Sequence, residues 1–364
     1  MNKIFVSLKE NSYPVLIGNS ILHYLQNEIE RNNLNRNILA VIDNNVAYYH
    51  LEKIKKILKD LKGKINYYLL KPGETTKSYI YLNKIYSFML EKGYGRDSLI
   101  IGIGGGVTGD LVGFAAATYM RGVQLIHMPT TLLAAVDSAI GGKTGINFEK
   151  KKNMIGAFYQ PKAVLADTGF FRTLPRKERT SGIGEIIKYG YLADSTFFEF
   201  LNENIYAVYD HDEEIVNRII LKCASIKASV VSKDEKESGV RKILNLGHTF
   251  AHGLESDLNF KIKHGEAVIA GIVSALILSD SLGLLPQDKL NKFLSLPLKI
   301  KMPKILAGID VKNVIRAMSH DKKNKNGKIK FVLPADIGKM LLGVEADSRI
   351  IKSSLLKMKK ELFY

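Results

Sequence analysis

Three of the eight histidines lie in one segment, residues 241–267, which reads RKILNLGHTFAHGLESDLNFKIKHGEA. His248 and His252 are four residues apart, so a helix would place both on one face, a spacing that metal-binding histidines use. Arg241 and Asn245 continue this face in steps of four, and the apolar residues between them indicate a buried helix. Buried polar side chains need partners, so the segment predicts a metal or ligand site. A solvated face with satisfied histidines is the alternative.

A carboxylate far upstream offers a further ligand. Glu185 lies among isoleucines in residues 182–190, GIGEIIKYG, with Lys188 three positions later. A Glu–Lys pair on a surface helix is the simpler interpretation, but the isoleucines indicate burial, and a buried carboxylate needs a cation. Together with two histidines, Glu185 would form the His₂Glu shell of a catalytic zinc site that keeps one position open for substrate. His264 begins the next apolar run and is the third histidine available.

A glycine-rich turn occupies residues 102–113, GIGGGVTGDLVG, after an apolar run and before a helical pattern. Gly104, Gly106 and Gly109 match G-x-G-x-x-G, a spacing that lets the backbone approach a pyrophosphate at a helix N-terminus. The match departs from the usual fingerprint, because it follows a late strand and the ribose-binding carboxylate would be Asp43, upstream. A plain tight turn is the alternative. Asp43 and a second turn at residues 72–74 favour a dinucleotide.

The polar run that follows, residues 127–161, adds candidate phosphate contacts. Thr130 and Thr131 stand between a strand and a helix, where they either cap the helix or touch a cofactor. Densely spaced glycines then let backbone and ligand come close. The same run contains one acid, two cations and an amide suited to a substrate phosphate: Asp137, Lys143, Lys152 and Asn153.

The secondary-structure pattern divides the chain in two. Up to about residue 170, expected strands at 38–43, 65–70, 98–102 and 124–128 alternate with helices at 46–62 and 76–92, which predicts a parallel sheet covered on both faces. Beyond residue 175 the pattern is helical, at 182–233, 243–258, 265–283 and 310–319. We therefore expect an NAD-binding α/β domain at 1–174 and an all-α metal- and substrate-binding domain at 175–364.

The composition of the chain limits the classes of protein to which it can belong. The chain has 364 residues, a single cysteine and a net charge of +17, and its lysines are spread over the whole length. Nucleic-acid binding is one reading of this charge, but no recognisable nucleic-acid motif accompanies it, and an anionic small substrate explains it better. No apolar run is long enough to span a membrane, and the start lacks a signal peptide. We expect a cytoplasmic protein that binds neither nucleic acid nor membrane.

An ordered set of motifs is more specific: GGGVTGDLVGFAAATYMRGV, MPTTLLAAVDSAIGGKTGIN, KNMIGAFYQP, GEIIKYG, LNLGHTFAHGLE, HGEAV and DKKNKNG. Together they resemble the 3-dehydroquinate synthases of the sugar-phosphate cyclase family, from about residue 43 to residue 327. The resemblance implies a Rossmann-like α/β domain followed by a helical domain, a homodimer, NAD⁺, and zinc or cobalt. It also implies conversion of 3-deoxy-D-arabino-heptulosonate 7-phosphate to 3-dehydroquinate and phosphate in the shikimate pathway, by transient oxidation, phosphate elimination, reduction and intramolecular aldol cyclisation.

The resemblance assigns roles residue by residue. It makes Glu185, His248 and His264 the metal ligands and turns His252 into a contact of the substrate phosphate. Positions that match cofactor contacts are Asp43, Asn45, Gly73, Glu74, Lys77, Gly105, Gly106, Val107, Gly109, Asp110, Thr130, Thr131, Asp137, Lys143, Lys152, Phe170 and Thr173. Positions that match the surroundings of the substrate are Asp137, Lys143, Asn153, Lys188, Lys227, Arg241, Asn245 and Lys322 or Lys323. Lys227 and Arg241 resemble a carboxylate clamp, and Arg121 resembles an arginine donated across a dimer interface.

Three other functions remain as alternatives. Another sugar-phosphate cyclase would share the fold, the NAD⁺ and the metal, but the clamp-like pair Lys227 and Arg241 favours a substrate carboxylate. A metal-dependent polyol dehydrogenase would consume NAD⁺ stoichiometrically and would not need so many phosphate-seeking cations. A basic nucleic-acid-binding protein would bind with a steep salt dependence and would tolerate loss of Glu185.

Overall fold

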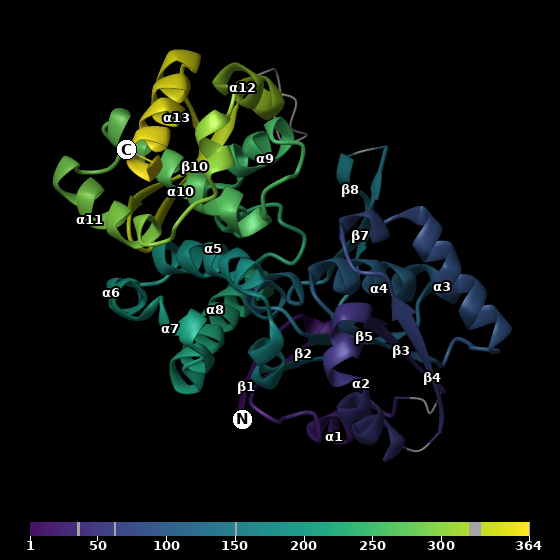
Figure 1. Cartoon of the computed structure of the whole chain (residues 1–364). Helices are drawn as coiled ribbons and strands as arrows, with labels where there is room; N and C mark the ends of the chain where they lie inside the picture. The colour runs from purple at the N-terminus through teal and green to yellow at the C-terminus, as the bar shows by residue number, and fades with distance from the viewer. Residues whose placement is uncertain (35–36, 62, 150, 320–328, 364) are drawn as a thin grey trace. The chain divides into compact units, whose positions relative to one another are not determined.

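The computed structural model describes residues 1–34, 37–61, 63–149, 151–319 and 329–363. The chain forms two compact units, residues 1–175 with 211–236, and residues 176–210 with 237–364 (Figure 1). The expected division at 174/175 differs in one segment, because residues 211–236 belong to the first unit. Helix α8 (Glu213–Lys233) in that segment packs against β1, β2 and the turn at residues 134–138, so packing and not chain order decides its place.

The first unit is built on a seven-stranded sheet in the order β1-β2-β9-β6-β5-β3-β4. All neighbours are parallel except β1 and β2. The central strands are continuous apolar runs because helices cover both faces. The four expected strands are present, and β1, β2 and β9 were not foreseen. The bounds are β1 (Asn2–Val6), β2 (Tyr13–Gly18), β3 (Asn37–Asp43), β4 (Lys64–Leu70), β5 (Leu99–Gly104), β6 (Gln124–Pro129) and β9 (Ala163–Asp167).

Helices α3 (Tyr79–Glu91) and α4 (Gly106–Thr118) cover one face of this sheet, and α1 (Tyr24–Arg31) and α2 (Asn44–Lys59) cover the other (Figure 1). A core forms under α3 and α4, where alternate strand residues such as Leu39 and Val41 meet apolar helix side chains. The short hairpin of β7 (Lys143–Phe148) and β8 (Lys151–Phe158) packs beside α4. Short turns complete the unit: η2 (Glu74–Thr76), η3 (Tyr119–Arg121), the π-helical η4 (Ala134–Ser138) and η5 (Thr168–Thr173).

The second unit is helical and surrounds α10 (His264–Ser281), which is almost entirely buried. This helix is apolar on every side, as a central helix must be. Helices α5, α9, α11 and α13 pack directly on it. The bounds of the remaining elements are α5 (Arg176–Leu192), α6 (Ser195–Asn204), α7 (Ala207–Asp210), η6 (Val240–Asn245), α9 (His248–Asp257), α11 (Gln287–Leu298), η7 (Lys304–Gly308), α12 (Val311–Ser319), α13 (Ser348–Phe363), β10 (Lys330–Asp336) and β11 (Lys339–Glu345).

Three expectations for this part of the chain need correction. The helix expected at 182–233 is four helices, α5 to α8, and the last belongs to the first unit. The helix expected at 243–258 begins only at His248, because Gly247 adopts a left-handed conformation with φ of 77°. Arg241 and Asn245 therefore lie on a separate 3₁₀ turn and not on the helix face of the histidines. The unit also contains the β10–β11 hairpin, which was not expected. Within the described residues, no helix is long and apolar enough to cross a membrane.

Candidate metal centre and nucleotide face

Glu185, His248 and His264 come together in the helical unit. Each offers one ligand atom, and these atoms lie within 4.8 Å of one another. Both histidines direct Nε2 at the same carboxylate oxygen, with His248 Nε2 and His264 Nε2 each 3.4 Å from Glu185 Oε1. Two imidazoles and one carboxylate form a donor set that suits Zn²⁺ or Co²⁺. The geometry therefore fits a divalent metal with one coordination position left for another ligand.

Close helix contacts bring these side chains together. A Cβ atom added at Gly265 would lie 1.8 Å from the carbonyl oxygen of Ser181, and one at Gly184 would lie 2.2 Å from the carbonyl oxygen of Gly265. Helices α5 and α10 can touch at this point only because both residues are glycine. Glu185 follows Gly184, and His264 precedes Gly265. The contact thus places a carboxylate and an imidazole from distant parts of the chain side by side.

Gly247 has the same role at the other histidine. A Cβ atom there would lie 2.9 Å from the backbone nitrogen of Ile272, and one at Gly271 would lie 2.2 Å from the carbonyl oxygen of Gly247. The left-handed backbone of Gly247 also ends the preceding 3₁₀ turn, so that α9 begins at His248 against α10. Each of the three candidate ligands therefore stands next to a glycine at a close helix crossing.

Charges in the cluster are coupled. Burial raises the pKa of Glu185, but Lys188 and the two histidines outweigh it and hold the pKa of this carboxyl well below its usual range. Burial lowers the pKa of His248 to about 4. Burial also lowers the pKa of His264, but hydrogen bonds to Glu185 and Glu255 dominate and raise it to about 10. The cluster thus holds an ionised carboxylate and one neutral imidazole, and a metal ion would displace the proton on the other.

Four other predicted residues lie in this unit. Lys188 pairs with Glu185 Oε2 and is 2% exposed. Arg241 is 1% exposed on η6. Asn245 Nδ2 donates to Glu237 Oε1 over 2.6 Å. His252 lies outside the three-residue cluster, with its ring centroid 5.8 Å from that of His248. The i, i+4 pair that first indicated a metal site is thus not the pair that shares Glu185.

The predicted nucleotide face lies in the first unit, at the carboxyl ends of β3 and β5. The chain continues from β3 to β4 on one side, whereas β5 pairs with β3 on the other. Open parallel sheets bind ligands at such a switch point. Asp43 ends β3, and its carboxylate accepts a 2.8 Å hydrogen bond from the backbone of Asn45 at the start of α2. Gly105 caps α4 directly after β5, so its helix N-terminus opens at the same edge.

The glycines of the turn also have packing roles. A Cβ atom at Gly104 would lie 2.5 Å from Thr108 Oγ1, and one at Gly105 would lie 2.9 Å from Thr131 Cγ2. A Cβ atom at Gly113 would lie 2.4 Å from Thr144 Cγ2, whereas one at Gly109 would make only an ordinary contact with the buried ring of His127. The tight turn that the sequence left as an alternative is therefore present. The first turns of α4, at this edge of the sheet, contain Gly106, Val107 and Asp110.

A hydrogen-bonded cluster joins this helix to the hairpin. Lys77 Nζ contacts both Asp110 Oδ2 and Asn153 Oδ1. Asn147, which sequence reasoning missed, ties the cluster together. Its side-chain amide donates to Glu74 Oε1 over 2.7 Å, its side-chain oxygen accepts from the Asn153 backbone over 2.9 Å, and its own backbone donates to the Lys77 carbonyl over 2.9 Å. In the sequence, the only signal for Asn147 was its place as the last residue of the GKTGIN motif.

A second cluster forms at the π-helical turn. Lys227 Nζ on α8 lies 2.9 Å from Asp137 Oδ1 and donates to the Asp137 carbonyl over 2.6 Å. Lys227 and Arg241, expected as one clamp, belong to different units. Thr131 Oγ1 accepts a hydrogen bond from the Ala134 backbone over 3.2 Å. Thr131 therefore caps the following turn, which is one of the two roles expected for it. Thr130 is buried, and its hydroxyl has no hydrogen-bond partner among the described residues.

The remaining predicted residues of the first unit lie on turns and on the hairpin. Thr173 Oγ1 and His50 Nε2 lie 2.8 Å apart and share a hydrogen bond, and the His50 ring packs edge-on against Phe170 with centroids 5.0 Å apart. Arg121 is exposed on η3 with φ of 70°. Others stand on loops and strands: Gly73 before η2, Lys143 on β7 and Lys152 on β8. Lys322 and Lys323 lie outside the described residues.

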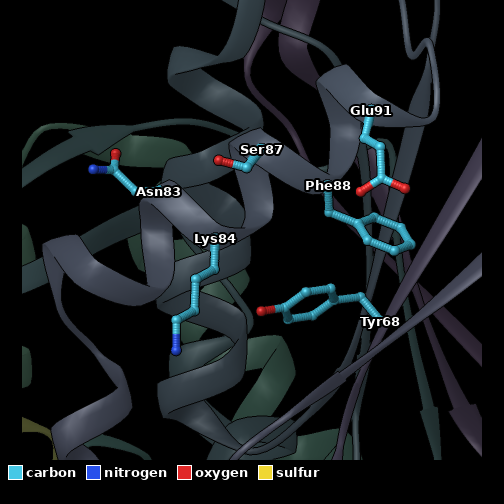
Figure 2. A pocket seen from close by; sticks show the side chains of 6 residues that line it. All are labelled: Tyr68, Asn83, Lys84, Ser87, Phe88 and Glu91. Atoms are coloured by element: carbon cyan, nitrogen blue, oxygen red, sulfur yellow. The ribbon is translucent and has the colours of Figure 1, made fainter.

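Figure 2 shows a surface pocket of about 360 Å³ between β4 and α3, lined by Tyr68, Asn83, Lys84, Ser87, Phe88 and Glu91. The rings of Tyr68 and Phe88 meet edge to face with centroids 5.3 Å apart. None of the predicted site residues lines this pocket. It lies at the edge strand of the sheet. The candidate site is therefore assigned to the cluster of Glu185, His248 and His264 and not to this pocket.

A parallel α/β unit followed by a helical unit with a Glu, His, His cluster defines a protein of the dehydroquinate synthase-like fold. Solved structures agree: a 2-deoxy-scyllo-inosose synthase with carbaglucose-6-phosphate, NAD⁺ and Co²⁺ is 24% identical with a TM-score of 0.89 over 98% of this chain and 99% of that chain. ValA, the 2-epi-5-epi-valiolone synthase of Streptomyces hygroscopicus subsp. jinggangensis with NAD⁺ and Zn²⁺, is 25% identical with a TM-score of 0.86 over 97% and 98%.

Sequence comparison identifies the family within this fold class. Residues 67–181 match the family domain "3-dehydroquinate synthase N-terminal", and residues 182–324 match "3-dehydroquinate synthase C-terminal". The 3-dehydroquinate synthase of Alkaliphilus metalliredigens is 43% identical over 93% of this chain and 94% of its own length. That of Ruminiclostridium cellulolyticum is 39% identical over 97% and 98%. The chain belongs to the 3-dehydroquinate synthase family.

Proposed function

We propose that this protein is a 3-dehydroquinate synthase, a carbon–oxygen lyase (EC 4.2.3.4) that converts 3-deoxy-D-arabino-heptulosonate 7-phosphate to 3-dehydroquinate and phosphate. Relatives with this name match almost the full length of the chain at about 40% identity. The observation that carries the proposal in the structure is the cluster of Glu185, His248 and His264. A nucleotide-binding sheet alone would fit many dehydrogenases, and a metal cluster in the same chain also fits a metal-dependent one. The match to relatives named 3-dehydroquinate synthase favours the family reaction.

The residues present fit NAD⁺ and a divalent metal. The strand ends at Asp43 and Gly105 offer the carboxylate and the helix N-terminus that a dinucleotide needs, and Glu185, His248 and His264 would hold Zn²⁺ or Co²⁺. The related valiolone synthase binds NAD⁺ and Zn²⁺. When bound, the metal would polarise a substrate hydroxyl, and NAD⁺ would accept and later return the hydride of the same carbon, so that NAD⁺ is not consumed.

The side chains of this protein would bind and orient an anionic substrate. Lys188 is buried against Glu185 and supplies a positive charge beside the metal site. His252, Arg241 and Asn245 lie in the same unit and would contact the substrate. In the first unit, Lys143, Asn153 and Lys227, which is paired with Asp137, would donate to phosphate and carboxylate groups. We name no protein base for proton removal, because the departing phosphate can take that role.

Two further assignments complete the proposal. We place the protein in the cytoplasm as a homodimer, with Arg121 reaching the neighbouring subunit. Arg121 is exposed on the turn η3, as a residue that reaches a neighbouring subunit must be. The single cysteine, Cys223, is buried and has no second cysteine in the chain to pair with, which fits a reducing compartment.

The decisive test is phosphate release. Purified protein with NAD⁺ and Zn²⁺ should release inorganic phosphate from the heptulosonate phosphate, while total NADH stays constant after many turnovers. Glu185→Ala serves as the control for metal-dependent turnover. Release from a sugar phosphate without a carboxylate at a comparable rate would favour another cyclase. Net reduction of NAD⁺ in proportion to product would favour a dehydrogenase. No release by folded, metal-loaded protein would reject the proposal.

A further inference from the structure

We propose that Glu255 is a positioning residue that fixes the ring of His264 for metal binding; this rests on the proposed metal centre. Sequence reasoning gave Glu255 no role. Its Oε2 lies 3.5 Å from His264 Nδ1, on the side of the ring opposite to Glu185. The imidazole is therefore held between two carboxylates, one at each nitrogen.

The two histidines of the cluster are supported in different ways. His248 Nδ1 lies 3.1 Å from the carbonyl oxygen of Leu246, two residues earlier on the same chain segment. A backbone carbonyl can only accept, so it fixes the proton on Nδ1 and leaves Nε2 free for a metal. Glu255 does the same for His264, but through a side chain from another helix. The tautomer of His264 thus depends on one replaceable residue.

The position of Glu255 between two helices explains how it can restrain the His264 ring. Glu255 lies on α9, seven residues after His248 and so on nearly the same face of that helix. His264 is the first residue of α10, and its side chain is 32% exposed. The His264 ring lies near the rings of His248 and His252, with centroids 5.3 and 6.5 Å apart, but neither ring holds its Nδ1. The carboxylate of Glu255, itself 2% exposed, restrains this nitrogen and links the end of α9 to the start of α10.

The link also affects the metal. A carboxylate on Nδ1–H makes the opposite ring nitrogen a stronger donor, and partners of this kind change metal affinity by about 10- to 100-fold. The carbonyl at His248 gives a weaker effect because it is uncharged. His264 is therefore the ligand whose donor strength this protein sets through a side-chain charge.

The test compares three variants by metal affinity, measured by chelator competition with Zn²⁺ and by the visible absorption spectrum of the Co²⁺-loaded protein. Glu255→Ala should weaken metal binding about 10- to 100-fold and alter the Co²⁺ spectrum. Glu255→Gln keeps an acceptor without the charge, so it should fall between Glu255→Ala and the unaltered protein. This second variant also serves if Glu255→Ala does not fold.

Glu266→Gln is the matched control. Glu266 is a buried carboxylate in the same helix turn as His264, but it accepts from the Lys263 backbone over 2.8 Å and caps the helix. The amide oxygen of glutamine can still accept this hydrogen bond, so Glu266→Gln should leave the Co²⁺ spectrum unchanged. Metal affinity and spectrum unchanged in folded Glu255→Ala or Glu255→Gln would overturn the inference, as would an equal spectral change in Glu266→Gln.

The readouts separate this inference from the proposed reaction. Unaltered protein that binds Zn²⁺ tightly but releases no phosphate would contradict the proposed activity and leave the role of Glu255 supported by its own variants. Unaltered protein that binds no divalent metal would reject both the metal centre and the role of Glu255.

Discussion

Two histidines, one in each unit, differ in the groups that surround them. His264 in the helical unit lies between the carboxylates of Glu185 and Glu255, which raise its pKa to about 10. His127 on β6 in the α/β unit is 6% exposed, its Nδ1 has no hydrogen-bond partner among the described residues, and burial lowers its pKa to about 4. The surroundings of His264 contain two carboxylates, which suit a bound cation. His127 occupies a packing position that excludes charge.

The same contrast holds for the two predicted binding regions. In the helical unit, the candidate ligands stand on helices that touch through glycines, so their spacing is set by the core. In the α/β unit, the predicted cofactor contacts stand on turns, strand ends and a hairpin, and many of their hydrogen bonds are exposed. We therefore expect single substitutions to have large effects in the metal cluster and smaller ones on the nucleotide face.

The largest effect should come from the cluster itself. Glu185→Ala, His248→Ala and His264→Ala should each weaken Zn²⁺ binding on the order of 1,000-fold, because each removes one of three protein ligands. His252→Ala should keep the metal and lose turnover. Metal content after gel filtration and chelator competition measure this. Equal metal loss in His252→Ala would show that the i, i+4 pair binds the ion after all.

The buried histidine of the α/β unit should make stability pH-dependent. The folded-state pKa of His127 is about 4 against an ordinary value of 6.5, so the unfolded chain binds an extra proton between these values. Stability should fall as the pH drops from about 6.5 to about 4, by on the order of 3 kcal/mol from this residue. His127→Gln should remove this part of the acid sensitivity.

Urea unfolding at several pH values, followed by circular dichroism, checks the prediction for His127. The exposed His23 gives the matched control, and His23→Gln should leave the pH dependence as it is in the unaltered protein. An unchanged acid slope in His127→Gln would mean that the ring finds a partner when it is protonated.

A glycine at the crossing of α5 and α10 should couple stability to metal binding. Gly265→Ala would push a methyl group against the Ser181 carbonyl, which should cost about 1–3 kcal/mol of stability and move His264 relative to Glu185. Thermal unfolding with and without Zn²⁺ measures both effects. Gly308→Ala is the control, because nothing lies within 4 Å of a Cβ atom there. Similar losses of stability in both variants would mean that the close contact of α5 and α10 at Gly265 is not the cause.

The smallest effect should come from Asn147. Asn147→Ala removes two exposed hydrogen bonds, each worth about 1 kcal/mol, and should raise the Kd for NAD⁺ about 5-fold in calorimetric titration. Asn147→Asp places a carboxylate against Glu74 and should be worse. The double variant Asn147→Asp with Glu74→Gln restores a donor and an acceptor, so it should bind more tightly than Asn147→Asp alone. No recovery would mean that the Glu74–Asn147 contact does not matter for NAD⁺.

Much of the fold follows from local sequence. The runs at 38–43 and 98–102 are continuous and apolar because both faces of a parallel sheet are covered, and this pattern is visible in one dimension. Strands β1 and β10 escaped notice because they lie at a sheet edge and in a two-stranded hairpin, where fewer residues are buried. The Gly247 turn escaped as well, because a helical pattern continues through it while its backbone does not.

The sequence by itself determined the chemical inventory: a carboxylate among isoleucines, three histidines within seventeen residues, a glycine-rich strand end and an excess of cations. The family resemblance had already named His264 and not His252 as the partner of His248 and Glu185, and the tertiary structure brings these three side chains together. Only the tertiary structure decided that Lys227 and Arg241 fall in different units and that Glu255 lies against His264. The reason is physical. Periodicity reports which residues share a face of one helix, whereas a metal cluster depends on which helices approach closely, and here glycines of distant segments set that approach.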